Sequence, residues 1–204
     1  MLLFINNTVT PTNSNDMAFV PKIRKALRYC DIPFYEVKKI REIPAEISSK
    51  ICGILISGSQ LRLSKPLEFS DFAHILHYLV KYNNVPVLGL CFGCQILHML
   101  HGGKLEDQIE RSCEDYRVEL SRHSLFKDVG LLKETFHQFA VCFHDLPVAF
   151  PKCSSIANFH HRGKVLPCAF EYSLNRFGMM IHPEIHVETY PVFTNFAKLC
   201  GLCL

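Results

Sequence analysis

The sequence of 204 residues lacks a strong excess of charge of either sign. Its formal net charge is +3, and the basic residues are scattered apart from one cluster at Lys38, Lys39 and Arg41. A balance this small provides little attraction to nucleic acid or to an anionic membrane surface. We therefore expect neither kind of partner, and we interpret the basic cluster as a solvated loop.

The sequence also lacks an uninterrupted apolar run long enough to cross a membrane. Its longest apolar stretch, residues 85–100, is interrupted by Pro86, Gln95 and two glycines. Residues 1–5 carry no basic leader and no cleavage site, so they predict a buried strand instead of a signal peptide. The ten cysteines do not have the dense spacing of a small secreted domain, which favours a reducing, cytoplasmic compartment.

The chain has the composition of one globular domain. Apolar residues make up 49% of it and charged residues 20%, which are ordinary values. No repeat, low-complexity tract or linker divides the chain, so we expect a single domain over residues 1–204.

Strand and helix patterns alternate through the first half of the chain. The predicted strands lie at 2–5, 33–37, 53–56 and 85–90, and the predicted helices at 17–30, 69–82 and 92–100. Continuous apolar strands between amphipathic helices predict an α/β fold, with a mostly parallel central sheet and helices on both faces. The second half predicts shorter strands at 116–120, 136–143, 154–158, 168–172 and 177–181, followed by a helix over 187–204.

The segment Gly89-Leu90-Cys91-Phe92-Gly93 has the pattern of a nucleophile elbow between a strand and a helix. In such a turn the central residue takes a strained conformation, and the flanking glycines remove Cβ atoms that would clash. Active sites in open α/β sheets form beyond the carboxyl ends of the strands. The pattern therefore predicts Cys91 as a nucleophile, and the alternative is a buried cysteine in a glycine-rich turn.

A second segment supplies the two other groups that a thiol nucleophile needs. His182 follows a predicted strand, and Glu184 lies two residues further, on the same side of an extended chain. An imidazole that takes the thiol proton and a carboxylate that orients it predict a hydrolytic triad of Cys91, His182 and Glu184. The alternative for His182 is a structural histidine.

Two Cys-x-x-Cys pairs compete with this interpretation. Cys91 and Cys94 have the spacing of a redox motif, and Cys200 and Cys203 repeat it near the end of the chain. Four thiolates could bind zinc, but the two pairs lie far apart in different contexts, so we expect no metal site. Redox chemistry is the better of these two alternatives.

Together these segments resemble the class I, triad-type glutamine amidotransferases over nearly the whole chain. The matching segments are residues 53–59, 87–95, 101–104, 125–127 and 177–184. The resemblance is closest to the amidotransferase unit of GMP synthases, with the anthranilate and aminodeoxychorismate synthase subunits behind it. It implies a flavodoxin-like α/β fold and a glutaminase that serves GMP and purine biosynthesis.

The resemblance assigns a role to each member of the triad. Cys91 would attack the side-chain carboxamide of L-glutamine, His182 would pass the thiol proton to the departing ammonia, and Glu184 would hold the imidazole. Water would then release glutamate from a γ-glutamyl thioester.

The resemblance also implies an oxyanion hole, formed by two backbone N–H groups, one from Phe92 and one from the loop of Gly58 and Ser59. The family usually has Gly-Gly-Pro where this chain has Gly58-Ser59-Gln60. Serine fits at position 59 without strain only if its φ is negative. If φ is positive, the hole is misaligned, and losing one such donor lowers the rate by about 10²- to 10³-fold.

Four residues are implied in substrate binding. Gln95 matches the glutamine-recognising position on the helix after the elbow, and Phe143-His144-Asp145 stands where the family has Ser-His-Gly. Only His144 is typical of the family in that segment. Asp145 would either bind the α-amino group of glutamine or close a turn.

The sequence has no glycine-rich phosphate loop, and little chain follows Glu184 in which an ATP-pyrophosphatase domain could lie. The resemblance therefore implies a glutaminase subunit without a cofactor or metal of its own. Its partner would be a separate ATP-dependent synthetase that binds ATP and Mg²⁺, and glutaminase activity would be low until that partner docks. The alternatives are a γ-glutamyl peptidase or hydrolase with the same triad, and a degenerate binding or regulatory module of the same fold.

Overall fold

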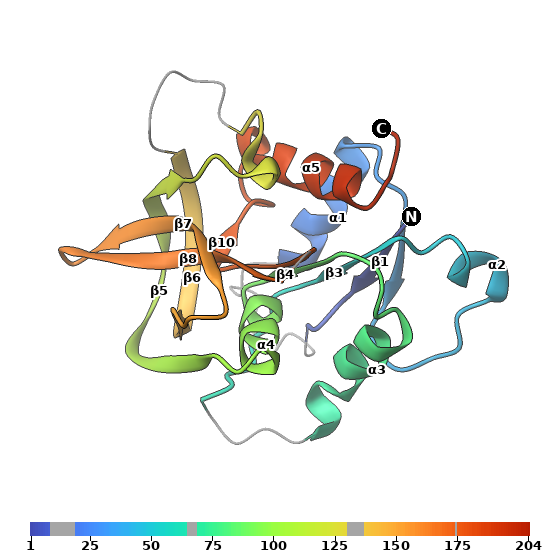
Figure 1. The fold of residues 1–204 in the computed structure, drawn as a ribbon, viewed down its shortest axis with the longest axis horizontal. Helices are drawn as coiled ribbons and strands as arrows, with labels where there is room; N and C mark the ends of the chain where they lie inside the picture. The colour runs from blue at the N-terminus through green and yellow to red at the C-terminus, as the bar shows by residue number, and fades with distance from the viewer. Residues whose placement is uncertain (9–18, 65–68, 130–136, 174) are drawn as a thin grey trace.

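The computed structural model describes residues 1–8, 19–64, 69–129, 137–173 and 175–204 (Figure 1). The strands in chain order are β1 (Leu2–Ile5), β2 (Phe34–Val37), β3 (Gly53–Ile56), β4 (Val87–Leu90), β5 (Lys104–Leu120), β6 (His137–Val148), β7 (Ser154–His161), β8 (Lys164–Ser173), β9 (Arg176–Met179) and β10 (Ile181–His182). They form one sheet in the order β10-β6-β5-β7-β8-β9-β4-β3-β1-β2.

The sheet has a parallel half and an antiparallel half. Strands β2, β1, β3, β4 and β9 pair in parallel, while β8, β7, β5, β6 and β10 continue the sheet in antiparallel pairs. The predicted α/β fold is therefore confirmed. The strand-rich second half extends the central sheet and does not build a sheet of its own.

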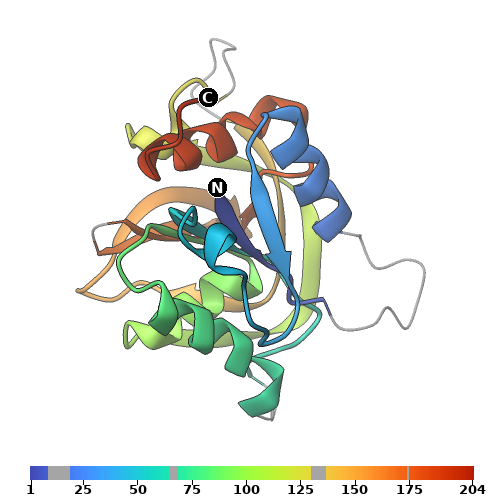
Figure 2. The ribbon, with the colours of Figure 1, turned by 90° about the vertical axis from the view of Figure 1, so that its right-hand side faces the viewer.

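Helices cover both faces of the parallel half. They are α1 (Phe19–Tyr29), α2 (Ala45–Ser48), α3 (Ala73–Lys81), α4 (Phe92–Leu100) and α5 (Pro191–Leu199). Figures 1 and 2 show α1 and α5 on one face of the sheet and α3 and α4 on the other. Every side chain of β1, β3 and β4 is buried between these layers, which explains the uninterrupted apolar runs.

Some boundaries differ from the sequence prediction. Strand β5 begins at Lys104, well before the predicted residue 116, because its charged first half pairs with β6. The predicted helix over 69–82 starts as a 3₁₀ turn (Phe69–Asp71) before α3. The predicted last helix likewise divides into a 3₁₀ turn (Val187–Thr189) and α5. The short helix α2 carries too little pattern to be predicted.

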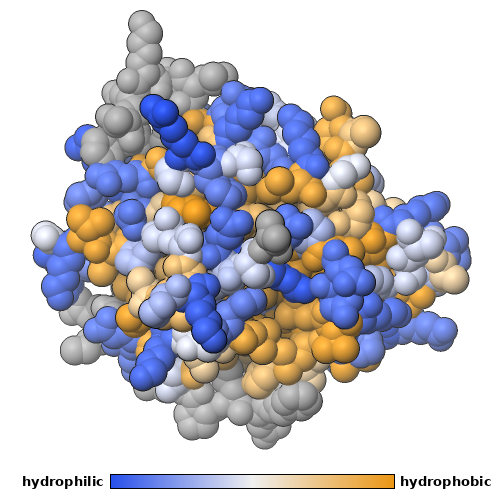
Figure 3. Space-filling view, viewed as in Figure 1, coloured by the Kyte–Doolittle hydropathy of each residue, from blue (hydrophilic) through white to orange (hydrophobic). Residues whose placement is uncertain are grey.

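The surface mixes polar and apolar groups. On the face shown in Figure 3, hydrophilic side chains alternate with hydrophobic ones, and a hydrophobic group lies over α3 and α4, where Val80, Met99 and Leu100 are exposed. None of the helices in the described ranges combines the length and the hydropathy that a bilayer crossing requires.

Candidate active site

Cys91 lies at the sharp turn between β4 and α4. Its backbone has φ 51° and ψ −106°, a region that residues with a Cβ rarely occupy. A Cβ at Gly89 would lie 2.4 Å from the carbonyl oxygen of Gly93, and one at Gly93 would lie 2.8 Å from the carbonyl oxygen of Ile56. The turn is therefore as tight as the glycine spacing predicts, and it holds Cys91 at the carboxyl edge of the sheet.

The sheet topology brings His182 to the same edge. Strand β9 runs parallel to β4, and the Cys91 N–H donates to the Met179 carbonyl over 2.7 Å. The chain then turns into β10, which ends at His182. Next to both residues lies Gly58, where an added Cβ would be 3.4 Å from Cβ of Cys91 and 3.9 Å from Cε1 of His182. The three segments singled out from the sequence thus meet at one point.

His182 and Glu184 form a buried pair. The distance between Nδ1 of His182 and Oε1 of Glu184 is 2.7 Å, and both side chains are fully buried. Oε1 accepts the Nδ1–H of the ring. Nε2 is therefore the ring nitrogen that can exchange a proton with another group. The second carboxylate oxygen, Oε2, has no hydrogen-bond partner among the described residues. The carboxylate of Glu184 therefore serves to orient the imidazole of His182.

The surroundings of His182 favour its protonated form. Burial alone lowers the pKa of the imidazole, but the charge of Glu184 and the interaction with the Cys91 side chain outweigh it. Together they raise the pKa of His182 to about 10. The protonated ring can give its proton to a leaving group. The arrangement suits thiol nucleophilic chemistry.

Phe19 covers the imidazole, a contact that sequence reasoning missed. The rings of Phe19 and His182 stack with centroids 4.4 Å apart and an interplanar angle of 21°. Phe19 is the first residue of α1, far from His182 along the chain. The ring shields the imidazole from solvent and restricts its rotation. No local pattern around Phe19 signals this role, because helix α1 has the pattern of an ordinary amphipathic helix.

The loop after β3 contains the predicted oxyanion residues Gly58 and Ser59. Neither is among the residues with positive φ, so serine at position 59 causes no backbone strain. The Ser59 hydroxyl donates to the Asn7 carbonyl over 2.8 Å and accepts from the Leu61 N–H over 3.2 Å. Serine therefore fastens the loop to the end of β1, where glycine could not.

The other predicted oxyanion donor, the N–H of Phe92, is the first N–H of helix α4. The first N–H groups of a helix have no acceptor within the helix. Phe92 follows Cys91 directly, so its N–H is available next to the sulfur.

The predicted substrate residues have different surroundings. The Gln95 side chain donates to the Asp145 carbonyl over 2.7 Å. The Asp145 carboxylate is itself buried; it accepts from the Ser64 N–H over 3.2 Å and lies 3.3 Å from an Arg62 nitrogen. Arg62 also pairs with Asp107. Asp145 lies within strand β6 and closes no turn; its carboxylate instead ties distant chain segments together.

Phe143 and His144 belong to strand β6, but their side chains lie outside the described part of the structure. Arg62, by contrast, is a charged partner of Asp145 that sequence reasoning did not identify. Nothing in the sequence signals it, because the pairing of Arg62 with Asp145 joins two distant segments of the chain.

The zinc interpretation of the two cysteine pairs finds no matching geometry. Cys94 is a buried free thiol whose sulfur lies 3.5 Å from the Tyr172 hydroxyl, and burial raises the pKa of this thiol. Cys200 packs against Gly53, at the start of β3, whereas Cys91 and Cys94 lie at the opposite edge of the sheet. The two pairs therefore cannot share a zinc ion. Across the described ranges, no group of three or more ligating side chains is placed to hold a metal.

Comparison with known proteins agrees with the geometry. The family model "Glutamine amidotransferase class-I" matches residues 14–199. The chain is 24% identical over 199 residues to a glutamine-hydrolysing GMP synthase subunit of Methanococcus vannielii, across 92% of this chain and 95% of that one. It is 25% identical over 209 residues to the protein of the same name from Methanothermobacter thermautotrophicus, across 98% of each.

Solved structures share the fold. A crystal structure from Thermoplasma acidophilum, described as that of a GMP synthase subunit, has a TM-score of 0.73 at 15% identity and covers 98% of this chain and 94% of that chain. The family match spans most of the 204 residues. The chain therefore belongs to the class I glutamine amidotransferase family.

Proposed function

We propose that this protein hydrolyses L-glutamine to glutamate and ammonia through Cys91, His182 and Glu184. The observation that carries the proposal is the strained elbow that holds Cys91 beside the buried pair of His182 and Glu184. A thiol, an imidazole and a carboxylate in this order are the parts of a nucleophilic hydrolase.

The reaction proceeds in two halves. The Cys91 sulfur attacks the side-chain carboxamide carbon, and a tetrahedral oxyanion forms. The C–N bond then breaks, and His182 gives its proton to the departing nitrogen, which leaves as ammonia. His182 next removes a proton from water, which attacks the γ-glutamyl thioester. Glutamate leaves and the proton returns to the Cys91–His182 pair.

The raised pKa of His182 suits this sequence of steps. With a pKa of about 10, the imidazole carries its proton at neutral pH and can act as the acid for ammonia at once. Backbone N–H groups of Gly58, Ser59 and Phe92 are proposed to bind the oxyanion.

Substrate recognition is proposed to use Gln95 and Arg62, with His144 and Phe143 as further candidates. The Arg62 side chain is 23% exposed and the Asp145 side chain 1%. Arg62, the more exposed of the two, is proposed to pair with the α-carboxylate of glutamine, while Asp145 holds Arg62 in place. Arg62→Ala should raise KM more than it lowers kcat.

The nitrogen acceptor is proposed to belong to a separate synthetase of the GMP synthase type. Support comes from the relatives that are named as glutamine-hydrolysing subunits of GMP synthase, since the chain matches almost their full length. ATP and Mg²⁺ are proposed to bind that partner, and glutamine hydrolysis is proposed to accelerate when the partner docks.

Steady-state turnover of glutamine and of γ-glutamyl peptides, with and without the synthetase, tests these proposals. Glutamine should be the preferred substrate, the synthetase should raise kcat, and Cys91→Ala should abolish turnover. Preference for γ-glutamyl peptides would favour the hydrolase alternative. Absence of turnover in every combination would favour the binding module.

A further inference from the structure

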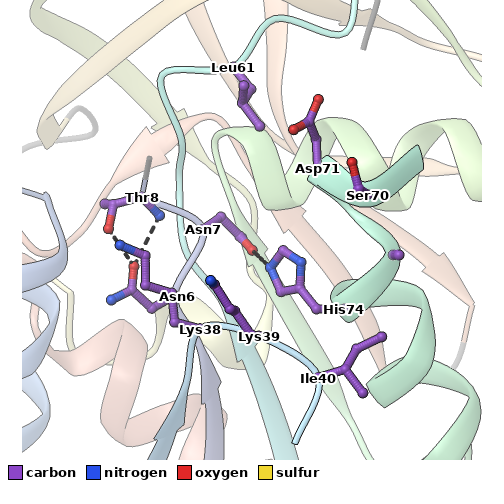
Figure 4. A pocket seen from close by; sticks show the side chains of 11 residues that line it. Asn6, Asn7, Thr8, Lys38, Lys39, Ile40, Leu61, Ser70, Asp71 and His74 are labelled. Atoms are coloured by element: carbon purple, nitrogen blue, oxygen red, sulfur yellow. Dashed lines mark hydrogen bonds between the residues drawn. The ribbon is translucent and has the colours of Figure 1, made fainter. Parts of the chain in front are cut away.

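A cleft opens at the carboxyl ends of β1 and β2. Its cavity volume is about 670 Å³, within the usual range for small-molecule sites. Figure 4 shows Asn7, from the end of β1, facing His74 of helix α3, while Asn6, Lys38 and Lys39 from the same strand ends also line the cleft. The described residues that line the cleft include none of Cys91, His182 and Glu184, so the cleft is distinct from the triad.

The topology marks this cleft as a place for a ligand. From β1 the chain goes first to β2 on one side and then to β3 on the other. The strand order therefore reverses at β1, and open α/β sheets bind ligands outside the carboxyl ends of the strands at such a point. Asn6 and Asn7 follow β1 directly, and Lys38 and Lys39 follow β2.

The charges on the cleft favour an anion. Within the described ranges, neither the Lys38 nor the Lys39 ammonium has a carboxylate partner. The Asp71 carboxylate also lines the cleft, but Asp71 already interacts within the protein. Two lysine side chains without a carboxylate partner among the described residues, both lining the cleft, suit a phosphate or carboxylate group.

Hydrogen bonds connect the cleft to the oxyanion loop. The backbone N–H of Asn7 donates to the Ser57 hydroxyl over 2.9 Å, and the side-chain amide of Asn7 donates to the Ser57 carbonyl over 2.9 Å. The Ser59 hydroxyl donates to the Asn7 carbonyl. On the cleft side, Oδ1 of Asn7 lies 2.8 Å from Nε2 of His74 (Figure 4).

The direction of that last bond follows from chemistry. The Asn7 amide nitrogen is occupied at Ser57, so Oδ1 accepts and Nε2 of His74 donates. Burial lowers the pKa of His74, which favours the neutral ring and leaves Nδ1 as an acceptor. Asn7 is thus held from the cleft side by His74 and holds the loop that carries Gly58 and Ser59.

We propose that this cleft binds a small metabolite bearing a phosphate or a carboxylate, and that its binding raises glutamine turnover through Asn7, whose hydrogen bonds hold the oxyanion loop. The effect on turnover rests on the proposed glutaminase function, whereas the binding does not. The ligand meets Lys38 and Lys39 with its anionic group.

Isothermal titration of the full chain with inorganic phosphate and with succinate tests the binding. At least one anion should bind saturably, and Lys38→Gln with Lys39→Gln should weaken it at least about tenfold. The anion that binds more tightly identifies the charged group of the metabolite. The matched control, Lys50→Gln with Lys198→Gln, removes the same charge away from the cleft and should bind like the parent protein. Equal losses in both double variants, or no binding of either anion, would overturn the proposal.

Glutamine turnover with and without the bound anion tests the connection to the active site. The anion should raise kcat at least about twofold in the parent protein and in the Lys50/Lys198 control, and not in the Lys38/Lys39 variant. Saturable binding with unchanged kcat would overturn the connection. If no form hydrolyses glutamine, the glutaminase proposal fails while the titration still decides on the cleft.

Discussion

Replacement of Cys91 by glycine should stabilise the protein relative to replacement by alanine. Both substitutions remove the thiol, so they differ only in the Cβ of alanine and in backbone freedom. Alanine at position 91 must keep the φ of 51° and ψ of −106°, which strains a residue with a Cβ by about 1–3 kcal/mol. Glycine adopts these angles without that strain.

The expected difference is the strain minus the usual disadvantage of glycine. Glycine loses more backbone entropy on folding, which costs about 0.5–1 kcal/mol relative to alanine. The net gain for Cys91→Gly over Cys91→Ala is therefore about 1 kcal/mol, or about 2–4 °C in Tm for a chain of this size. Ala26→Gly, in the buried face of helix α1, is the matched control and should destabilise the protein by about 1 kcal/mol.

Thermal and urea unfolding of the three variants and the parent protein provide the measurement. The reasoning predicts opposite signs for alanine-to-glycine exchange at positions 91 and 26. If Cys91→Gly is less stable than Cys91→Ala by the usual amount, the elbow holds no strain at Cys91, and the structural argument for its role as a nucleophile fails.

Three further predictions concern the groups around Cys91. Because the Glu184 carboxylate raises the pKa of His182, Glu184→Gln should lower the basic pKa of the kcat/KM profile by about 1–3 units; an unmoved basic limb would contradict the pairing. Phe19→Leu keeps an apolar cover but removes the ring stack, so the protein should lose about 0.5–1.5 kcal/mol of unfolding free energy and the pH profile of kcat/KM should shift. An unchanged stability and pH profile would show that the stack is incidental. Ser59→Ala removes both hydroxyl bonds of the oxyanion loop and should reduce kcat with KM nearly constant; a change confined to KM would place Ser59 in substrate binding instead.

The sequence predicts the elbow well because its signal is local. Gly89 and Gly93 flank Cys91, and each stands where a Cβ would collide with backbone. The apolar runs of β1, β3 and β4 are likewise predicted correctly, because strands that are buried on both faces tolerate few polar residues. A short segment contains everything that such a prediction needs.

Contacts between distant segments could not be predicted in the same way. The stack of Phe19 on His182 and the pairing of Arg62 with Asp145 join residues that only the folded sheet brings together. The early start of β5 has the same origin, because strand β6 supplies backbone partners that the charged residues of β5 do not signal.

The backbone conformation at Ser59 is a further feature that the sequence alone could not predict. The sequence could state only that a negative φ is required there, and Ser59 is not among the residues with positive φ. Its hydroxyl also makes two bonds that a glycine could not make, which a comparison of residue types alone would not suggest.

The account depends most directly on Cys91 acting as the nucleophile with His182 as its proton carrier. Peptide mass spectrometry after treatment with an electrophilic glutamine analogue tests this in one measurement. The account predicts an adduct on Cys91 in the parent protein, protection by L-glutamine, and slow or absent labelling in His182→Asn. Labelling of Cys91 that neither glutamine nor His182→Asn affects, or an adduct on another cysteine alone, would contradict it.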